Sequence, residues 1–165
     1  MEKITSEVMT KDLVTVVMGA PLSDAFVLMR DRRIRHLPVT DEAGEVIGIL
    51  SDRDISRAMT PDPEADPSGA DDAQFDPSFR ARDFMTWPVR TVADDVPVQD
   101  VARRMLKEKV SALLVVDRTR KIRGIETTDD LLKLLIRLLD KERGGLVMTL
   151  DSITQDWGFS AGNWM

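Results

Sequence analysis

Two short stretches of the chain carry residue types that could hold a sugar and a phosphate. GILSDRD (48–54) and GIETTDD (124–130) share the pattern Gly-Ile-x-Ser/Thr-x-x-Asp, 76 positions apart. A helix N-terminus offers N–H groups and positive potential to an anion. An ionised carboxylate can accept two hydrogen bonds from a vicinal diol. The pattern therefore favours a binding site for a phosphorylated sugar.

The same spacing also fits a helix cap that needs no ligand. Ser51 or Thr127 would be the N-cap and Asp54 or Asp130 the acid at N3, close to a capping box. Such a cap stabilises a helix by about 1 kcal/mol. Capping does not explain the glycine three positions before each Ser or Thr, which allows a ligand or another chain segment to come close. Both interpretations stay open at this point.

The composition excludes most kinds of catalytic and metal site. The 165-residue chain has no cysteine and one histidine, which rules out disulfides, thiolate metal sites and multi-histidine metal sites. Asp129 and Asp130 are adjacent carboxylates, but neighbouring residues at a helix start point in different directions. We therefore expect no enzymatic activity, no metal and no obligatory cofactor.

The charge balance argues against nucleic acid as a partner. The net charge is −6 and the pI about 4.9, whereas a nucleic-acid binder needs a basic face. The one basic run, 30–36, begins at a predicted helix end, where cations meet the negative end of the dipole. No apolar run approaches the roughly 20 residues that cross a bilayer, and the N-terminus lacks an apolar signal sequence. We expect a cytoplasmic protein that contacts neither nucleic acid nor membrane.

The chain is an internal duplication. At an offset of 76, residues 8–59 align with 84–135 without a gap, and identical pairs include Met9 with Met85 and Thr15 with Thr91. Each copy predicts the order strand, helix, strand, strand, helix from its β-branched runs, its helical spacing and its turn residues. Because a unit of about 50 residues buries too little surface alone, we expect the two copies to share a core.

The predicted boundaries follow from this duplication. Repeat one spans 2–59, a linker 60–78, repeat two 79–138 and a C-terminal tail 139–165. The linker holds four prolines and six acidic residues, which is typical of an exposed, flexible segment. The tail carries the aromatic residues Trp157, Phe159 and Trp164, which either pack back on the domain or contact a partner.

These patterns resemble a known family. The repeated Met-Thr-x-x-x-x-Thr-Val, the strand RHLPVTD and the repeated Gly-Ile-x-Ser/Thr-x-x-Asp look like a stand-alone pair of cystathionine-β-synthase (CBS) domains. The resemblance implies an α+β (mixed α/β) fold in which two β-α-β-β-α repeats form a pseudo-twofold disc with two clefts. In many members the clefts bind AMP, ADP, ATP or S-adenosylmethionine.

The resemblance also implies a role. Such modules regulate an attached or separate target protein, often as homodimers, through a conformational or dimer rearrangement. We therefore predict a sensor of adenosine-type ligands. The alternative is a ligand-free interaction or dimerisation scaffold that acts through the CBS faces and the aromatic tail. An RNA- or DNA-contacting regulator that uses the basic run is weaker, because the net charge is acidic.

By the family pattern, each cleft joins the motif of one repeat to the first strand and the hairpin strand of the other. Cleft one would use Ser51, Asp54, Thr86, Val89, Arg90, Val110, Ser111 and Ala112. Cleft two would use Thr127, Asp130, Thr10, Leu13, Val14, Ile34, Arg35 and His36.

The phosphates of a ligand need cations, and the two repeats differ in them. Arg35, His36 and Arg53 belong to repeat one, whereas Ser111, Ala112 and Asp129 hold the matching places in repeat two. We therefore predict clefts of unequal affinity, with basic side chains mainly from repeat one. For His36 a second interpretation stays open, in which the ring stacks at a domain seam.

Overall fold

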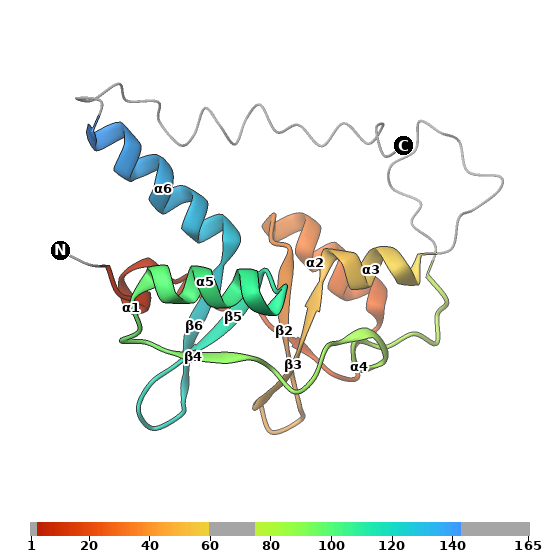
Figure 1. Cartoon of the computed structure of the whole chain (residues 1–165). Coiled ribbons are helices and arrows are strands. Elements are labelled where there is room, and N and C mark those ends of the chain that lie inside the picture. The colour runs from red at the N-terminus through yellow and green to blue at the C-terminus, as the bar shows by residue number, and fades with distance from the viewer. Residues whose placement is uncertain (1–2, 60–74, 143–165) are drawn as a thin grey trace, which may run out of the picture.

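The computed structural model describes residues 3–59 and 75–142, which are coloured in Figure 1. Each repeat has the predicted order of strand, helix, strand, strand and helix, preceded by a short helix that was not predicted. Repeat one comprises α1 (Thr5–Val8), β1 (Val16–Val17), α2 (Leu22–Arg32), β2 (His36–Thr40), β3 (Val46–Ser51) and α3 (Asp52–Ala58). Repeat two comprises α4 (Ala81–Phe84), β4 (Thr91–Ala93), α5 (Val98–Glu108), β5 (Ala112–Val116), β6 (Ile122–Thr127) and α6 (Thr128–Glu142).

The two repeats build the same three-stranded sheet. In the first, β1 runs parallel to β2, and β2 pairs antiparallel with β3. In the second, β4, β5 and β6 have the same arrangement. Each hairpin turns at an aspartate, Asp41 or Asp117, whose carboxylate accepts two backbone N–H groups of its own turn. The α+β fold with two matching repeats is therefore confirmed.

The helix before each hairpin begins and ends by a repeated device. Pro21 and Pro97 lie one residue before α2 and α5, as cap residues, where a missing N–H costs nothing. Arg33 and Lys109 end these helices in the left-handed conformation, with φ of 51° and 57°. The predicted helix end in the basic run is thus confirmed at Arg32.

The opening segment of each repeat packs on the other repeat. The backbone of Thr10 exchanges two hydrogen bonds of 2.9 Å with Ile125 of β6. Thr86 exchanges bonds of 2.9 and 3.0 Å with Ile49 of β3. Figure 1 shows the consequence, because α1 lies beside α5 and α4 lies beside β3. Neither half of the fold is therefore made from one repeat alone.

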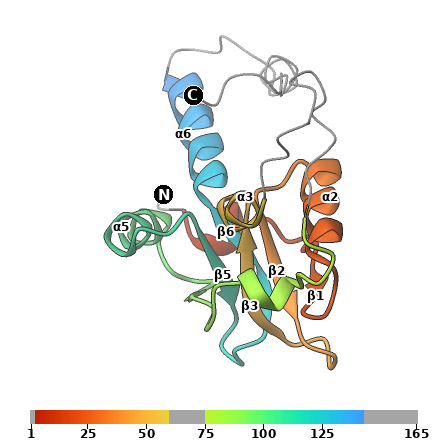
Figure 2. The same cartoon turned by 90° about the vertical axis from the view of Figure 1, so that its right-hand side faces the viewer.

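The core forms two clusters, one in each half. The first is centred on Leu22, Leu37 and Leu50 and includes Ala81 from the start of repeat two. The second is centred on Val101 and Leu113. The residue of repeat two that matches Leu50 is Glu126, which is also fully buried. Figures 1 and 2 show α6 rising away from the sheets at the end of the second half.

Part of the predicted linker also contacts the core. Phe75 lies 5.5 Å from Phe26 of α2, measured between ring centroids, and packs against the first cluster. Residues 60–74, which make up most of that linker, and the aromatic residues Trp157, Phe159 and Trp164 lie outside the described residues. Their predicted roles stay predictions.

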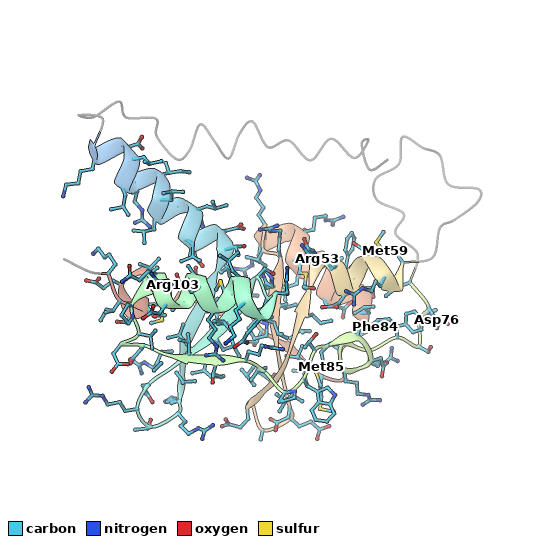
Figure 3. The ribbon with its side chains drawn as sticks, in the orientation of Figure 1. Arg53, Met59, Asp76, Phe84, Met85 and Arg103 are labelled. Atoms are coloured by element: carbon cyan, nitrogen blue, oxygen red, sulfur yellow. The ribbon has the colours of Figure 1, made fainter. Side chains whose placement is uncertain are left out.

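We expect alanine at Gly124 to destabilise the fold more than alanine at Gly48. A Cβ on Gly124 would lie 2.6 Å from the backbone oxygen of Thr10, within the exchanged segment. A Cβ on Gly48 would instead meet the flexible end of Met85, which Figure 3 labels beside β3. Overpacking of this kind costs about 1–3 kcal/mol. Thermal unfolding measures the difference, with Gly19→Ala as a control because that Cβ would meet nothing within 4 Å. Equal losses at Gly48 and Gly124 would contradict the expectation.

Candidate functional site

A groove of about 200 Å³ lies between the two repeats, at the motif that ends β3. The eight residues predicted for cleft one all line it: Ser51, Asp54, Thr86, Val89, Arg90, Val110, Ser111 and Ala112. They meet because the segment after α4 crosses to repeat one and brings the start of β4 with it. The exchange of opening segments therefore builds this groove.

Seven further residues line the groove. His36 and Arg53 were predicted as site residues, but His36 was assigned to cleft two. The structure places its ring in the first groove. Sequence reasoning missed Ile49, Arg57, Pro88, Lys109 and Leu114. Two of these had a usable signal: Ile49 lies two positions before Ser51 and Leu114 two positions after Ala112, so each shares a strand face with a predicted residue.

Asp54 forms the predicted cap and keeps one oxygen toward other partners. Its Oδ2 accepts hydrogen bonds from Ser51 N at 2.9 Å and Ser51 Oγ at 2.6 Å. Its Oδ1 accepts a hydrogen bond from Arg57 Nη1 at 3.1 Å. The residue as a whole is 8% exposed. The hydrogen bonds therefore agree with the capping interpretation. Because the cap uses Oδ2, Oδ1 is the oxygen with which a diol would bond.

Four cationic side chains line the groove, two from each repeat. Arg53 and Arg57 lie on α3, and Figure 3 labels Arg53. Arg90 directly precedes β4, and Lys109 directly follows α5. With His36, repeat one supplies three of the basic residues in this groove and repeat two supplies two, so the expectation that they come mainly from repeat one stays a prediction. Arg90 also forms an ion pair with Glu108, and Arg90 and Arg104 together lower the pKa of that carboxyl.

His36 connects the two repeats at the groove. Its Nε2 lies 2.8 Å from Ser111 Oγ, in the position of a hydrogen bond. Burial lowers the pKa of His36 below 6.5, while the nearby Asp52 carboxylate opposes that shift. The ring is therefore neutral at pH 7 and contributes a polar contact between the repeats.

The second motif has the same cap, but side chains of the protein already contact the other oxygen of its aspartate. Asp130 Oδ2 accepts from Thr127 N at 2.9 Å and from Thr127 Oγ1 at 2.6 Å. Its Oδ1 accepts from Thr10 Oγ1 at 3.2 Å, and Lys133 Nζ lies 3.9 Å away. An ion pair between Arg35 and Asp129 joins the repeats beside it. The oxygen that is held by an exposed arginine in the first site is held here by the exchanged segment.

Three of the remaining residues predicted for cleft two are partly buried. Val14 and Ile34 pack against the first core cluster, and Leu13 is half-buried. The cation pattern also differs, because Asp129 stands where Arg53 stands in repeat one. The structure thus brings Thr10, Thr127 and Asp130 together, with Arg35 on the adjacent Asp129.

A larger hollow of about 450 Å³ lies elsewhere, beside the start of α1 and the β5–β6 turn. Asp94, Asp95 and Asp117 line it, with one arginine, Arg118. Three carboxylates disfavour an anion, and the hollow contains neither motif. We therefore take the smaller groove between the repeats as the candidate site.

The sequence matches one family model and several individual proteins. A family model described as CBS domain matches residues 5–61 and 81–137. A CBS domain-containing protein of Dictyostelium discoideum is 30% identical over 140 residues, which cover 85% of this chain and 96% of that protein. The L-aspartate semialdehyde sulfurtransferase of Methanosarcina acetivorans is 34% identical over 134 residues, 81% of this chain. The chain spans about a quarter of the length of that enzyme and of the related archaeal enzymes it matches.

Solved structures agree with these matches. The CBS domain pair of protein MJ0100, in complex with 5′-methylthioadenosine and S-adenosyl-L-methionine, is 27% identical with a TM-score of 0.66 and covers 82% of this chain and 97% of that one. The cytosolic domain of the Mg²⁺ channel MgtE, in complex with ATP, is 29% identical with a TM-score of 0.57, over 77% and 46%. Within residues 3–59 and 75–142, no helix is long and apolar enough to cross a membrane.

We expect Asp54→Ala and Asp130→Ala each to destabilise the protein without any ligand. Each change leaves the backbone N–H of Ser51 or Thr127 without its carboxylate acceptor, at a cost of about 1–2 kcal/mol. The loss should be larger for Asp130, because its further bond holds Thr10 of the exchanged segment, whereas the further bond of Asp54 is to the 73% exposed Arg57. Urea denaturation of both variants checks this. An unchanged midpoint in either would show that its cap does not stabilise the helix.

Proposed function

Because this chain belongs to the CBS domain family, we propose that it is a regulatory module whose groove between the repeats binds a phosphate-bearing adenosine ligand. One observation carries the proposal: four cationic side chains and the capped Asp54 line the same groove. The ligands of the two related structures, ATP in one and S-adenosyl-L-methionine with 5′-methylthioadenosine in the other, support an adenosine group. A module of this kind regulates and does not catalyse.

The charge of the groove selects among adenosine ligands. Arg53, Arg57 and Lys109 attract phosphate oxygens, and arginine can bind them with two parallel hydrogen bonds. S-adenosylmethionine has no phosphate, and its sulfonium and ammonium groups outweigh its single carboxylate, so the same side chains attract it less than they attract a nucleotide. We therefore place AMP, ADP or ATP above S-adenosylmethionine, with the base against the apolar side chains of Ile49, Val89 and Leu114.

Arg57 connects sugar binding to phosphate binding. It holds Asp54 Oδ1, the oxygen that the ribose diol would need, and its own side chain is 73% exposed. A bound diol would take that oxygen and release the guanidinium toward the phosphates. The groove of about 200 Å³ is smaller than the roughly 300–1,000 Å³ of typical ligand pockets, so binding requires side chains at its rim to move. Displacement of Arg57 supplies one such movement.

The second motif does not bind a ligand in this proposal. Thr10 donates a hydrogen bond to Oδ1 of Asp130, and the ion pair of Arg35 with Asp129 joins the two repeats beside it. Asp129 also places a negative charge where Arg53 would meet a phosphate. One ligand per chain follows. Its effect on a target requires a different affinity for two arrangements of the repeats or of a homodimer.

A second candidate function rests on α6. Leu132, Leu135, Leu138 and Leu139 on this helix are each about half exposed. Exposed apolar residues in a group favour contact with another protein. A ligand-free interaction scaffold, or a homodimer, would use this face, and it would leave the groove empty when ligands are added.

We expect AMP, ADP or ATP to raise the melting temperature, and S-adenosylmethionine and adenosine to raise it less. A ligand that binds only the folded state must stabilise it. Asp54→Ala should abolish the shift relative to the variant's own baseline, whereas Asp130→Ala should keep it. Calorimetry should give one site per chain. Two equal sites, or no shift with any of these ligands, would contradict the proposal, and the latter would favour the scaffold.

We expect Arg53→Asp to weaken nucleotide binding at least tenfold. The change gives repeat one the residue that repeat two has at the matching place, Asp129. Removing one charge-assisted contact costs about 1.5–3 kcal/mol, and the new carboxylate adds repulsion. Arg118→Asp is the matched control, since it makes the same change of charge on a 91% exposed side chain outside the groove. Titration calorimetry with AMP compares the two, and equal affinities would count against Arg53 as a phosphate contact.

A further inference from the structure

Glu126 is a carboxylic acid in the interior of the second half. It lies in β6 with 0% exposure, opposite Leu113 of β5. Neither carboxyl oxygen has a hydrogen-bond partner among the described residues. The matching residue of repeat one is Leu50, which is buried to the same degree in the first core cluster. The duplicated fold therefore has an apolar side chain in one copy and an acid in the other.

The elements around Glu126 offer it no counter-ion. β6 packs against β5, α6 and α1, and β5 carries no charged side chain. On α1, Glu7 is paired with Lys3. On α6, Asp129 is paired with Arg35, and Lys133 lies 3.9 Å from Asp130 with its side chain half exposed. The carboxylate of Asp130 has the same sign as an ionised Glu126. An ionised carboxylate here would be buried without a partner, which is strongly unfavourable.

We propose that Glu126 is a proton-binding site, whose protonated form packs as a core residue and whose ionised form loosens β6 from α1 and α6. Burial, and then the charge of Asp130, raise the pKa of Glu126 to about 8. The site is therefore protonated at neutral pH and loses its proton in mildly alkaline conditions. This inference does not depend on a ligand in the groove.

The position of Glu126 determines what its ionisation would disturb. Its neighbour Ile125 holds the exchanged segment through two backbone bonds with Thr10, and Asp130 accepts a third bond from Thr10. Gly124, two residues before Glu126, lies against the same segment. Loss of the proton would therefore weaken the attachment of repeat one's opening segment to the second half.

The pH dependence follows from the sign of the shift. The folded state holds the proton up to about pH 8, whereas an unfolded chain loses it near 4.5. Below pH 4.5 both states hold the proton, so Glu126 gives the free energy of unfolding no pH dependence there. Between these values the unfolding equilibrium constant should rise about tenfold per pH unit, and above about 8 it should level off.

Urea unfolding of the full chain between pH 5.5 and 8.5 tests the proposal with Glu126→Gln, which has a similar shape and no titration. The ratio of unfolding constants, wild type over variant, should rise about a hundredfold from pH 5.5 to 7.5. Glu126→Leu, which restores the residue of repeat one, should remove the same dependence. Glu42→Gln in an exposed turn is the control and should behave as wild type. A ratio that stays constant with pH would overturn the proposal.

Carbon-13 NMR of the wild-type carboxyl keeps the test decisive if either Glu126 variant fails to fold. The Glu126 resonance should titrate near pH 8, and a midpoint near 4.5 would overturn the proposal. Hydrogen exchange adds the structural readout. In wild type, raising the pH from 7 to 9 should lower the protection factors of β6 and α1 more than those of β3. An equal change in both halves would show that ionisation does not act on β6.

Discussion

The exchange of opening segments between the repeats is the interaction on which the rest of the structure depends. Thr10 pairs with Ile125 and Thr86 with Ile49 through backbone hydrogen bonds, and both contacts pass over a glycine at the same place in the motif. A side chain at Gly124 would collide with the Thr10 backbone, so this glycine is required by the crossing and not by a ligand. The crossing carries Thr86 and the start of β4 to the Ser51–Asp54 cap. The groove is therefore a consequence of how the two halves are held together.

The same crossing produces two sites whose chemistry differs. In both sites, Oδ2 of an aspartate caps a helix. The two sites differ in the group that donates a hydrogen bond to Oδ1. The second carboxylate oxygen of Asp54 accepts a hydrogen bond from the exposed Arg57, while that of Asp130 accepts one from Thr10 of the exchanged segment. Arg53 in one copy corresponds to Asp129 in the other, and Leu50 corresponds to Glu126. Duplication thus preserved the backbone geometry, which the core and the crossing require, while the groove charge and one core position were free to diverge.

Sequence alone predicted what depends on local pattern and on the duplication. The order of elements, the helix ends and the eight residues gathered at the first groove follow from periodicity, capping and the family pattern. The short helices α1 and α4 were missed because four residues carry too little periodicity to signal a helix. His36 was assigned to cleft two, whereas it lines the first groove. Glu126 was missed although the offset of 76 matches it to Leu50, because a glutamate in a strand is ordinarily expected on the exposed face. The family pattern placed Thr10 beside Asp130, but it did not predict that the Thr10 hydroxyl would donate to the Asp130 oxygen that a ligand would need.

His36 and Glu126 have pKa values that are shifted by burial, and these two shifts act on stability in opposite directions. Burial lowers the pKa of His36 below 6.5, so its contribution is complete above that value and is lost as the pH falls through the folded pKa. Burial raises the pKa of Glu126 to about 8, so its contribution declines as the pH rises from 4.5. The two effects can oppose each other only between pH 4.5 and 6.5, and above 6.5 Glu126 acts without His36. His36 lies at the groove, and Glu126 lies in β6, which packs against α1 and α6. Acid would therefore weaken the contact between the repeats at the groove, and alkali would weaken the packing of β6. The contact between the repeats and the interior of the second half thus respond to opposite changes of pH.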